Sequence, residues 1–288
     1  MRIFRGKVMN FFEKILNALE GTMNTPGNYG WFHIMFMLIV IATTVLLCKF
    51  FRNSSDKTFR KIILIGWIII VVLEIYKQLI FSFEYDNGVS TWNYSWYSFP
   101  FQLCSTPIYA LPFIVFLKDG KVRNAFISYT ATFALFGGVA VMFYPNDVFI
   151  ETIGINIQTM IHHGSQVVFG IFISVRYLKD LNWKFVLRGI PVFVVFLLIA
   201  YGLNIGMYHY FQNNGIDATF NMFYIGPYYE CTLPVLSGIY PKVPYIVFAL
   251  IYILGFALIA FIMTYIHIGI NQLVLLIKKL VSGKKENA

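Results

Sequence analysis

The stretch Trp31–Phe51, "WFHIMFMLIVIATTVLLCKFF", decides the fold class, because Lys49 is its only Lys, Arg, Asp or Glu. An α-helix needs about 20 mostly apolar residues to cross about 30 Å of hydrocarbon. The whole chain has the same character, since 58% of its 288 residues are hydrophobic and only 12% are charged. A water-soluble core does not absorb that much apolar sequence. The sequence therefore predicts an all-α, polytopic membrane helical bundle.

Runs of similar length recur along the chain and predict about seven transmembrane helices in a single domain over residues 29–275. They cover residues 31–51, 62–82, 99–117, 124–144, 157–178, 185–209 and 243–270. The first twenty residues are different, because their apolar groups recur at helical spacing with charges on the other face, and no uninterrupted signal-peptide core occurs among them. We expect residues 1–28 to form an amphipathic segment in the membrane interface.

The distribution of Lys and Arg sets the expected orientation. The basic clusters are five residues from Lys49 to Lys61, three from Lys118 to Arg123, four from Arg176 to Arg188 and four from Lys278 to Lys285. The alternate connections 83–98 and 145–156 contain neither Lys nor Arg. Basic loops are cytoplasmic, so the N-terminus is expected outside and residues 276–288 are expected to form a basic cytoplasmic tail.

The distribution of Lys and Arg also explains the net charge of +9. Because the basic residues alternate from loop to loop, they indicate membrane orientation and not a nucleic-acid surface. Basic clusters next to a membrane suit anionic lipid headgroups. Membrane lipids, as phospholipid or lysophospholipid, are therefore the expected partners and nucleic acid is not, while the sequence leaves protein partners open.

The segment Ser95–Phe113, "SWYSFPFQLCSTPIYALPF", places Cys104 about five residues below the expected outer surface. Pro100 and Pro107 lie within four residues of the thiol, and a proline-interrupted helix leaves backbone groups free to line a cavity. A lone cysteine in a membrane helix is more often a small hydrophobe. The three cysteines have neither metal spacing nor a disulfide framework, although a bridge between Cys104 and Cys231 stays open.

A second polar segment, "NIQTMIHHGSQVVFG", places His162 and His163 at a similar depth. Gln158, His162 and Gln166 recur every four residues, so this stripe faces protein or water. Two interpretations apply to the histidines: hydrogen bonding between packed helices, or a role in chemistry.

In the segment 62–82, Glu74 precedes Lys77 and Gln78 by three and four residues, which puts all three on one helix face. The structural interpretation is a pair of opposite charges that satisfy each other. The functional interpretation is that Glu74 orients a histidine base and Lys77 holds a phosphate. The sequence leaves both open.

If these helices touch, Cys104, a histidine and Glu74 form an arrangement for acyl transfer inside the membrane. A thiol, with an ordinary pKa of about 8.5, becomes a good nucleophile when an imidazole takes its proton. A carboxylate then holds the imidazole in the required tautomer. The sequence does not decide between His162 and His163. It contains no recognisable zinc spacing and no glycine-rich phosphate loop, so no metal or cofactor is expected.

The segments "FPFQLCSTP", "IHHGSQ" and "FNMFYIGPYYECTLPVL", in that order, resemble the YwaF-like bacterial integral membrane proteins and their eukaryotic relatives, the transmembrane protein 164 acyltransferases. The resemblance implies transfer of acyl chains onto lysophospholipids, and hence phospholipid remodelling, through a cysteine nucleophile and a histidine. The family pattern falls on Pro100 and Cys104, on His162 or His163, and on Asn221, Tyr224 and Pro227.

One position departs from the pattern, because many bacterial relatives carry histidine where this chain has Gln102. This glutamine either removes a polar partner or supplies a donor for an oxyanion. The bacterial branch also implies a multi-pass protein of the bacterial plasma membrane.

Three function classes follow. The leading hypothesis is an acyltransferase with Cys104 as nucleophile and Gln166 among the supporting polar residues. The second is a transporter or small-molecule binding subunit with an intramembrane site around Glu74, Lys77 and His162, against which the lack of an inverted repeat argues. The third is a non-catalytic scaffold whose polar residues only join helices.

Overall fold

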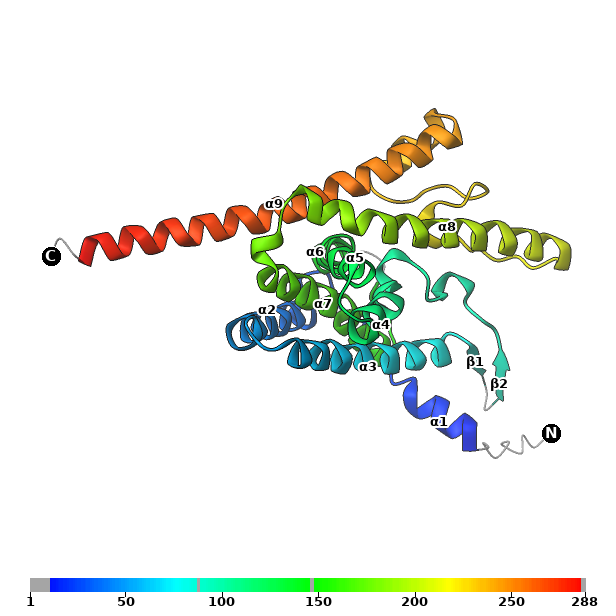
Figure 1. Ribbon diagram of the computed structural model, residues 1–288. Helices are drawn as coiled ribbons and strands as arrows, with labels where there is room; N and C mark the ends of the chain where they lie inside the picture. The colour runs from blue at the N-terminus through cyan, green and yellow to red at the C-terminus, as the bar shows by residue number, and fades with distance from the viewer. Residues whose placement is uncertain (1–10, 87–88, 146–147, 286–288) are drawn as a thin grey trace, which may run out of the picture.

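The computed structural model describes residues 11–86, 89–145 and 148–285, and helices make up most of them (Figure 1). The helices are α1 (Phe11–Leu19), α2 (Trp31–Phe51), α3 (Asp56–Ile80), α4 (Pro107–Phe116), α5 (Lys121–Tyr129), α6 (Leu135–Phe143), α7 (Ile153–Arg176), α8 (Trp183–Asn214) and α9 (Tyr245–Lys285). Strands β1 (Phe83–Asp86) and β2 (Val89–Trp92) form an antiparallel hairpin that pairs Phe83 with Trp92.

Five helical stretches are long and apolar enough to cross a membrane. They are α2, α3, the continuous stretch Lys121–Phe143, α8, and α9 as far as Ile277. The predicted helix 99–117 is a short apolar helix over Leu103–Phe116. Helix α7 has 24 residues but is not among the five, because its polar side chains lower its hydropathy. A multi-pass membrane bundle is confirmed, whereas seven spans and their orientation stay predictions.

Helix α7 lies inside the bundle and packs against α2, α3 and α6 (Figure 1). Fifteen of its 24 residues are buried, including both histidines and both glutamines. Polar side chains are costly against lipid, so the helix that carries most of them is surrounded by other helices. On another side, α7 packs against the continuous helical stretch α5–α6. Helices α5 and α6 are joined by a fully buried π-helical turn, Thr130–Ala134.

Glycines set how closely α6 approaches α7. A Cβ atom at Gly138 would lie 2.6 Å from the carbonyl oxygen of His163. A Cβ atom at Gly170 would lie 2.5 Å from the Cβ of Leu135. Small residues at helix contacts let backbones pack closely in a membrane. This close packing brings the polar residues of α7 against α6.

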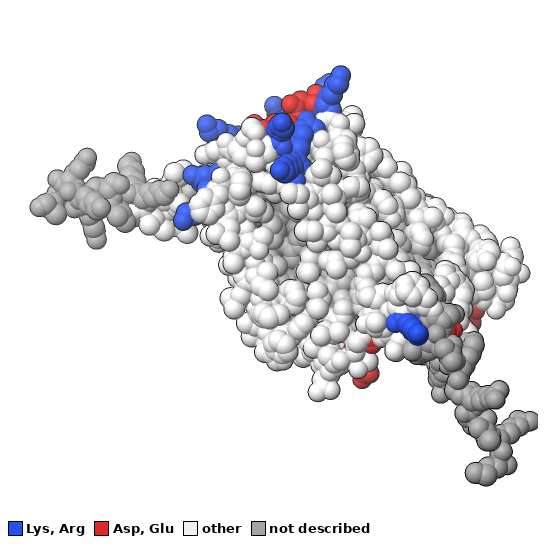
Figure 2. All heavy atoms as spheres, turned by 90° about the horizontal axis from the view of Figure 1, so that it is seen from below, with Lys and Arg blue, Asp and Glu red and all other residues white. Residues whose placement is uncertain are grey.

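Charged side chains gather at opposite ends of the molecule, with an uncharged surface between them (Figure 2). At one end, which we call the basic end, Asp56 accepts hydrogen bonds from Arg60 at 2.5 Å and from the buried Arg123 at 2.6 Å. The opposite end, which we call the hairpin end, contains α1 and the β1–β2 hairpin (Figure 1). This separation fits the alternation of basic loops along the sequence.

The expected all-α membrane bundle fits the structure, which adds the small β1–β2 hairpin after α3. Residues 276–285 belong to α9, while residues 286–288 lie outside the described residues, and a basic cytoplasmic tail over 276–288 stays a prediction. Of the expected interfacial segment 1–28, residues 1–10 also lie outside the described residues.

The described part of that N-terminal segment packs onto the bundle. Leu16 is 1% exposed, and the Tyr76 hydroxyl donates a 2.9 Å hydrogen bond to the carbonyl of Leu19. Next to it, the Met23 amide donates to the carbonyl of Glu151 at 2.7 Å. An interfacial position for α1 stays a prediction.

Candidate active site

Cys104 lies in a 3₁₀ turn, η2 (Leu103–Ser105), which begins the short helix that continues as α4. The Thr106 hydroxyl fixes this turn, because it donates to the Leu103 carbonyl at 2.6 Å and shares a 2.5 Å hydrogen bond with the hydroxyl of the fully buried Tyr129. Cys104 therefore lies in the first turn of a short apolar helix.

Two side chains of α7 hold the Cys104 peptide. The Cys104 carbonyl accepts a hydrogen bond from Nε2 of His162 and another from Nε2 of Gln166, each at 2.8 Å. Because a carbonyl only accepts, the neutral His162 ring carries its proton on Nε2. Its Nδ1 and the Oε1 of Gln166 are buried without a partner among the described residues. His162 and Gln166 thus position the cysteine.

The ring of His163 forms its hydrogen bond through the other nitrogen. Its Nδ1 donates a 2.8 Å hydrogen bond to the carbonyl of Thr159, one turn earlier on α7. The neutral ring is therefore protonated on Nδ1, and Nε2 keeps a lone pair that accepts a proton. His163 lines the same cavity as Cys104. Of the two histidines, His163 is therefore the one that shares a cavity with Cys104.

The shared cavity has a volume of about 340 Å³. Its polar and reactive lining groups are Gln102, Cys104, His163, Tyr144, Tyr224 and Tyr252. The remaining wall is mostly apolar and comes from α6, α9 and the connection between α8 and α9. Ligand pockets of about 300–1,000 Å³ with a few polar groups among apolar walls are typical of small-molecule sites.

The connection between α8 and α9 folds back into the bundle and closes one side of the cavity. Met222 and Phe223 are at most 1% exposed, and Asn204 holds Met222 through hydrogen bonds of 2.6 and 2.9 Å to its amide and carbonyl. Phe223 and Tyr224 have φ angles of 56° and 53°, in the left-handed region. Each such residue costs about 1–3 kcal/mol and persists only where its surroundings fix it.

Gln102 is one of the residues that fix this backbone. Its Oε1 accepts from the Phe223 amide at 2.7 Å and its Nε2 donates to the Asn221 carbonyl at 3.0 Å. The Tyr252 hydroxyl donates to the Phe223 carbonyl at 2.8 Å. Gln102 therefore joins the turn of Cys104 to the loop between α8 and α9 through two hydrogen bonds.

Two of the three family positions in this loop, Asn221 and Tyr224, have different places. Asn221 stabilises the loop itself, because its Oδ1 accepts from the Gly226 amide at 2.8 Å and its Nδ2 donates to the Glu230 carbonyl at 3.2 Å. Tyr224 lines the cavity. Burial raises the pKa of the Tyr224 phenol, so the hydroxyl keeps its proton and is able to donate a hydrogen bond.

Glu74 lies in a polar network beside this site. Its Oε1 is 2.7 Å from both the Lys77 ammonium and the Gln78 amide, and its Oε2 accepts from Gln158 of α7 at 3.4 Å. These contacts favour the structural interpretation of the Glu74–Lys77 pair. Lys77 still acts electrostatically on the Cys104 thiol and on both imidazoles, and Glu74 acts on the thiol and on His163.

Two further observations limit the chemistry. Within the described ranges, no group of three or more His, Cys, Asp or Glu side chains has the geometry to hold a metal ion. All three thiols are free, including Cys231, which is buried among apolar side chains. Cys231 does not line the cavity that contains Cys104 and His163.

Sequence reasoning missed several parts of the site. Thr159 fixes the His163 tautomer, and its position one helical turn earlier is a signal that the sequence contains. Tyr252 and Phe223 line the cavity from segments far away in the chain, and nothing in their local sequence indicates it.

The fold and the site together define a multi-pass membrane protein with a cysteine and a histidine on one buried, mostly apolar cavity. The model of the TMEM164 family matches residues 28–268, and the chain belongs to this family. A search of curated proteins and a search of solved structures both give no match.

Proposed function

We propose that this protein is a membrane-embedded acyltransferase, which moves a fatty acyl group onto a lysophospholipid through a thioester on Cys104. The observation that carries the proposal is that Cys104 and His163 line one cavity, while the hydrogen bond from His163 to Thr159 leaves Nε2 available as a base. Membership of the TMEM164 family supports it. The proposal places the chain in a bacterial plasma membrane, where it remodels phospholipids.

The first half-reaction forms the thioester. Nε2 of His163 takes the thiol proton, and the sulfur attacks the ester carbonyl of a donor phospholipid. The carbon–sulfur bond forms and the carbon–oxygen bond of the ester breaks. The proton on His163 passes to the departing alkoxide, which leaves as a lysophospholipid.

The second half-reaction reverses these roles. His163 takes a proton from the hydroxyl of the acceptor lysophospholipid, whose oxygen attacks the thioester carbonyl. The carbon–sulfur bond breaks, and the proton returns from His163 to the sulfur. The mostly apolar wall of the cavity excludes water and limits hydrolysis of the thioester.

Other residues position the reacting groups. His162 and Gln166 hold the Cys104 peptide through its carbonyl. Tyr224 lines the cavity with a protonated phenol, which we assign as a donor to the tetrahedral oxyanion. Loss of one such donor lowers kcat by about 10²–10³-fold in other enzymes, and we expect a similar loss for Tyr224→Phe.

The test uses purified protein in lipid nanodiscs with a phospholipid donor whose acyl chain is radiolabelled. We expect a label on the protein that hydroxylamine removes, that is absent from Cys104→Ala and that persists in Cys231→Ala. Cys231 is the matched control, because it is also a free thiol near the site but lies outside the cavity lining. A folded protein that takes no label, or a label that persists in Cys104→Ala, would overturn the proposal and favour a binding site around Glu74 and Lys77.

A further inference from the structure

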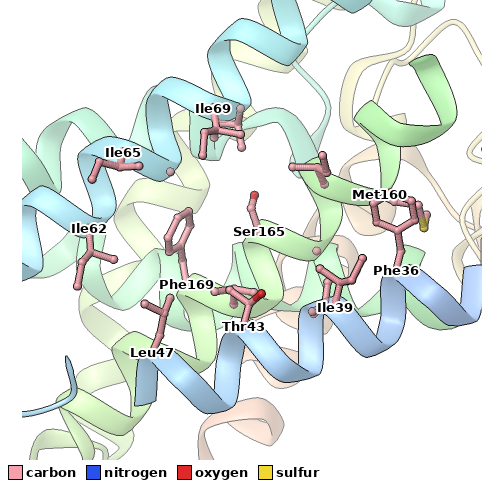
Figure 3. Close-up of a pocket in the computed structure, with 16 residues that line it drawn as sticks. Phe36, Ile39, Thr43, Leu47, Ile62, Ile65, Ile69, Met160, Ser165 and Phe169 are labelled. Atoms are coloured by element: carbon pink, nitrogen blue, oxygen red, sulfur yellow. The ribbon is translucent and has the colours of Figure 1, made fainter. Parts of the chain in front are cut away.

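Helix α2 packs mainly on α7, and helix α3 packs on α4 and α7, whereas α2 and α3 hardly touch each other. Glycines bring α7 close to both. A Cβ atom at Gly164 would lie 2.4 Å from Cγ2 of Val40 on α2, and a Cβ atom at Gly66 of α3 would lie 1.9 Å from the Phe169 ring of α7. The two helices therefore spread apart above α7 and leave a groove between them (Figure 3).

The groove has a volume of about 380 Å³ and an almost entirely apolar lining, with the hydroxyls of Thr43 and Ser165 as its only side-chain polar groups. The Ser165 hydroxyl already donates a 2.7 Å hydrogen bond to the His162 carbonyl. Ile39 and Ile65, on opposite walls, are 48% and 50% exposed, so the groove opens to the outside of the bundle. Apolar cavities of this kind stay free of water, so hydrocarbon is the occupant that the lining favours.

The length of the groove and the charged residues at its end favour the acyl chain of a phospholipid. Along α2 the lining runs from Phe36 to Leu47, about 16 Å at the helical rise, which is roughly half of a hydrocarbon core of about 30 Å. That length matches an acyl chain in one leaflet. The groove ends at Leu47 and Ile62, next to the exposed Lys49 and Lys61, whose ammonium groups suit a lipid phosphate.

We propose that this groove binds an acyl chain of a phospholipid from the leaflet at the basic end, with the phosphate beside Lys49 and Lys61. The site is separate from the Cys104 cavity, because the groove is lined by Gly164 and Ser165 of α7, whereas the cavity is lined by His163. A bound chain supports the same turn of α7 that carries the two histidines. The proposal goes beyond acyl transfer and does not depend on it.

The test uses nanodiscs that contain phosphatidylglycerol with a photoactivatable diazirine in its acyl chain, followed by mass-spectrometric mapping of the crosslinked peptides. We expect crosslinks to concentrate on the facing walls of α2, α3 and α7. Ser165→Phe fills the groove from the α7 side and should lower the yield of crosslinked peptides several-fold. Ser165→Ala removes only the hydroxyl and leaves the groove open, so its crosslinking yield should match that of the native protein. Thr43→Phe, from the wall on α2, is a second filling variant if Ser165→Phe does not fold.

Crosslinks spread evenly over the lipid-facing helices, or a yield unchanged in the folded filling variants, would overturn the proposal. The headgroup position is tested by Lys49→Gln combined with Lys61→Gln, which should lower the yield, against Lys184→Gln at the same end of the molecule, which should not. Equal yields in these variants would contradict the phosphate position. Thioester formation on Cys104, measured in the same samples, reports separately on the acyltransferase proposal.

Discussion

His162 and His163 are neighbours in the sequence, yet their rings have opposite hydrogen-bonding arrangements. His162 donates from Nε2 to the Cys104 carbonyl, and His163 donates from Nδ1 to the Thr159 carbonyl. Consecutive residues on a helix point about 100° apart at 3.6 residues per turn, and of the two histidines only His163 lines the cavity. The choice between them depends on how α7 packs against α6 and against the turn of Cys104, which the sequence does not show.

The Glu74–Lys77 pair gives a prediction at the residue scale. Both side chains are largely buried and 2.7 Å apart, so Glu74→Gln leaves the Lys77 ammonium buried without its counter-charge. We expect a loss of about 3 kcal/mol in the free energy of unfolding in detergent, the lower end of what breaking a buried pair costs. The double variant Glu74→Gln with Lys77→Met should recover most of this loss.

A double variant as unstable as the single one would contradict the structural interpretation of this pair. So would a stable Glu74→Gln protein that takes no acyl label, because the carboxylate would then act in the chemistry. The sequence predicted the pair from the spacing of three residues, but its partner Gln158 on α7 depends on the packing of two helices.

At the scale of elements, the largest difference from the sequence prediction is the helix of Cys104. The apolar run 99–117 predicts a full span, but the helix starts only at Leu103, with Pro107 at the first position of α4. Proline suits the first turn of a helix and interrupts its interior, which explains the late start. As a consequence, Cys104 lies at the N-terminal end of a helix inside the bundle.

The contact between α6 and α7 gives a prediction at this scale. A methyl group at Gly138 would lie 2.6 Å from the His163 carbonyl oxygen and 2.7 Å from the Cβ of Gln166, so Gly138→Ala pushes the two helices apart. We expect a lower melting temperature and slower acylation of Cys104. Gly202→Ala on α8 is the control, because no atom lies within 4 Å of its added methyl group. Equal melting temperatures for the two variants would show that this close approach is not required.

At the scale of the whole molecule, the sequence predicted the multi-pass membrane class, which the five long apolar helices confirm. Hydropathy and charge are local properties, so they can be read without a structure. The cavity could not be predicted in the same way, because its walls come from α6, α9 and the returning loop, which meet only in the folded bundle.

The orientation gives a prediction for the whole molecule. The hairpin end is expected outside and the basic end in the cytoplasm. In a variant whose three cysteines are replaced by alanine, Thr91→Cys in β2 should react with a membrane-impermeant maleimide on intact cells, and Asp180→Cys near the start of α8 should react only after lysis. The reverse pattern would show that the orientation derived from the basic loops is wrong.

The most direct test of the central claim is the rate of Cys104 acylation in the native protein, in His163→Gln and in His162→Gln. Loss of a general base lowers a rate by about 10²–10⁴-fold, so His163→Gln should fall in this range. His162→Gln should retain much more of the rate, because a glutamine amide is still able to donate to the Cys104 carbonyl. A larger loss in His162→Gln than in His163→Gln, or no loss in either, would contradict His163 as the base of a Cys104 nucleophile.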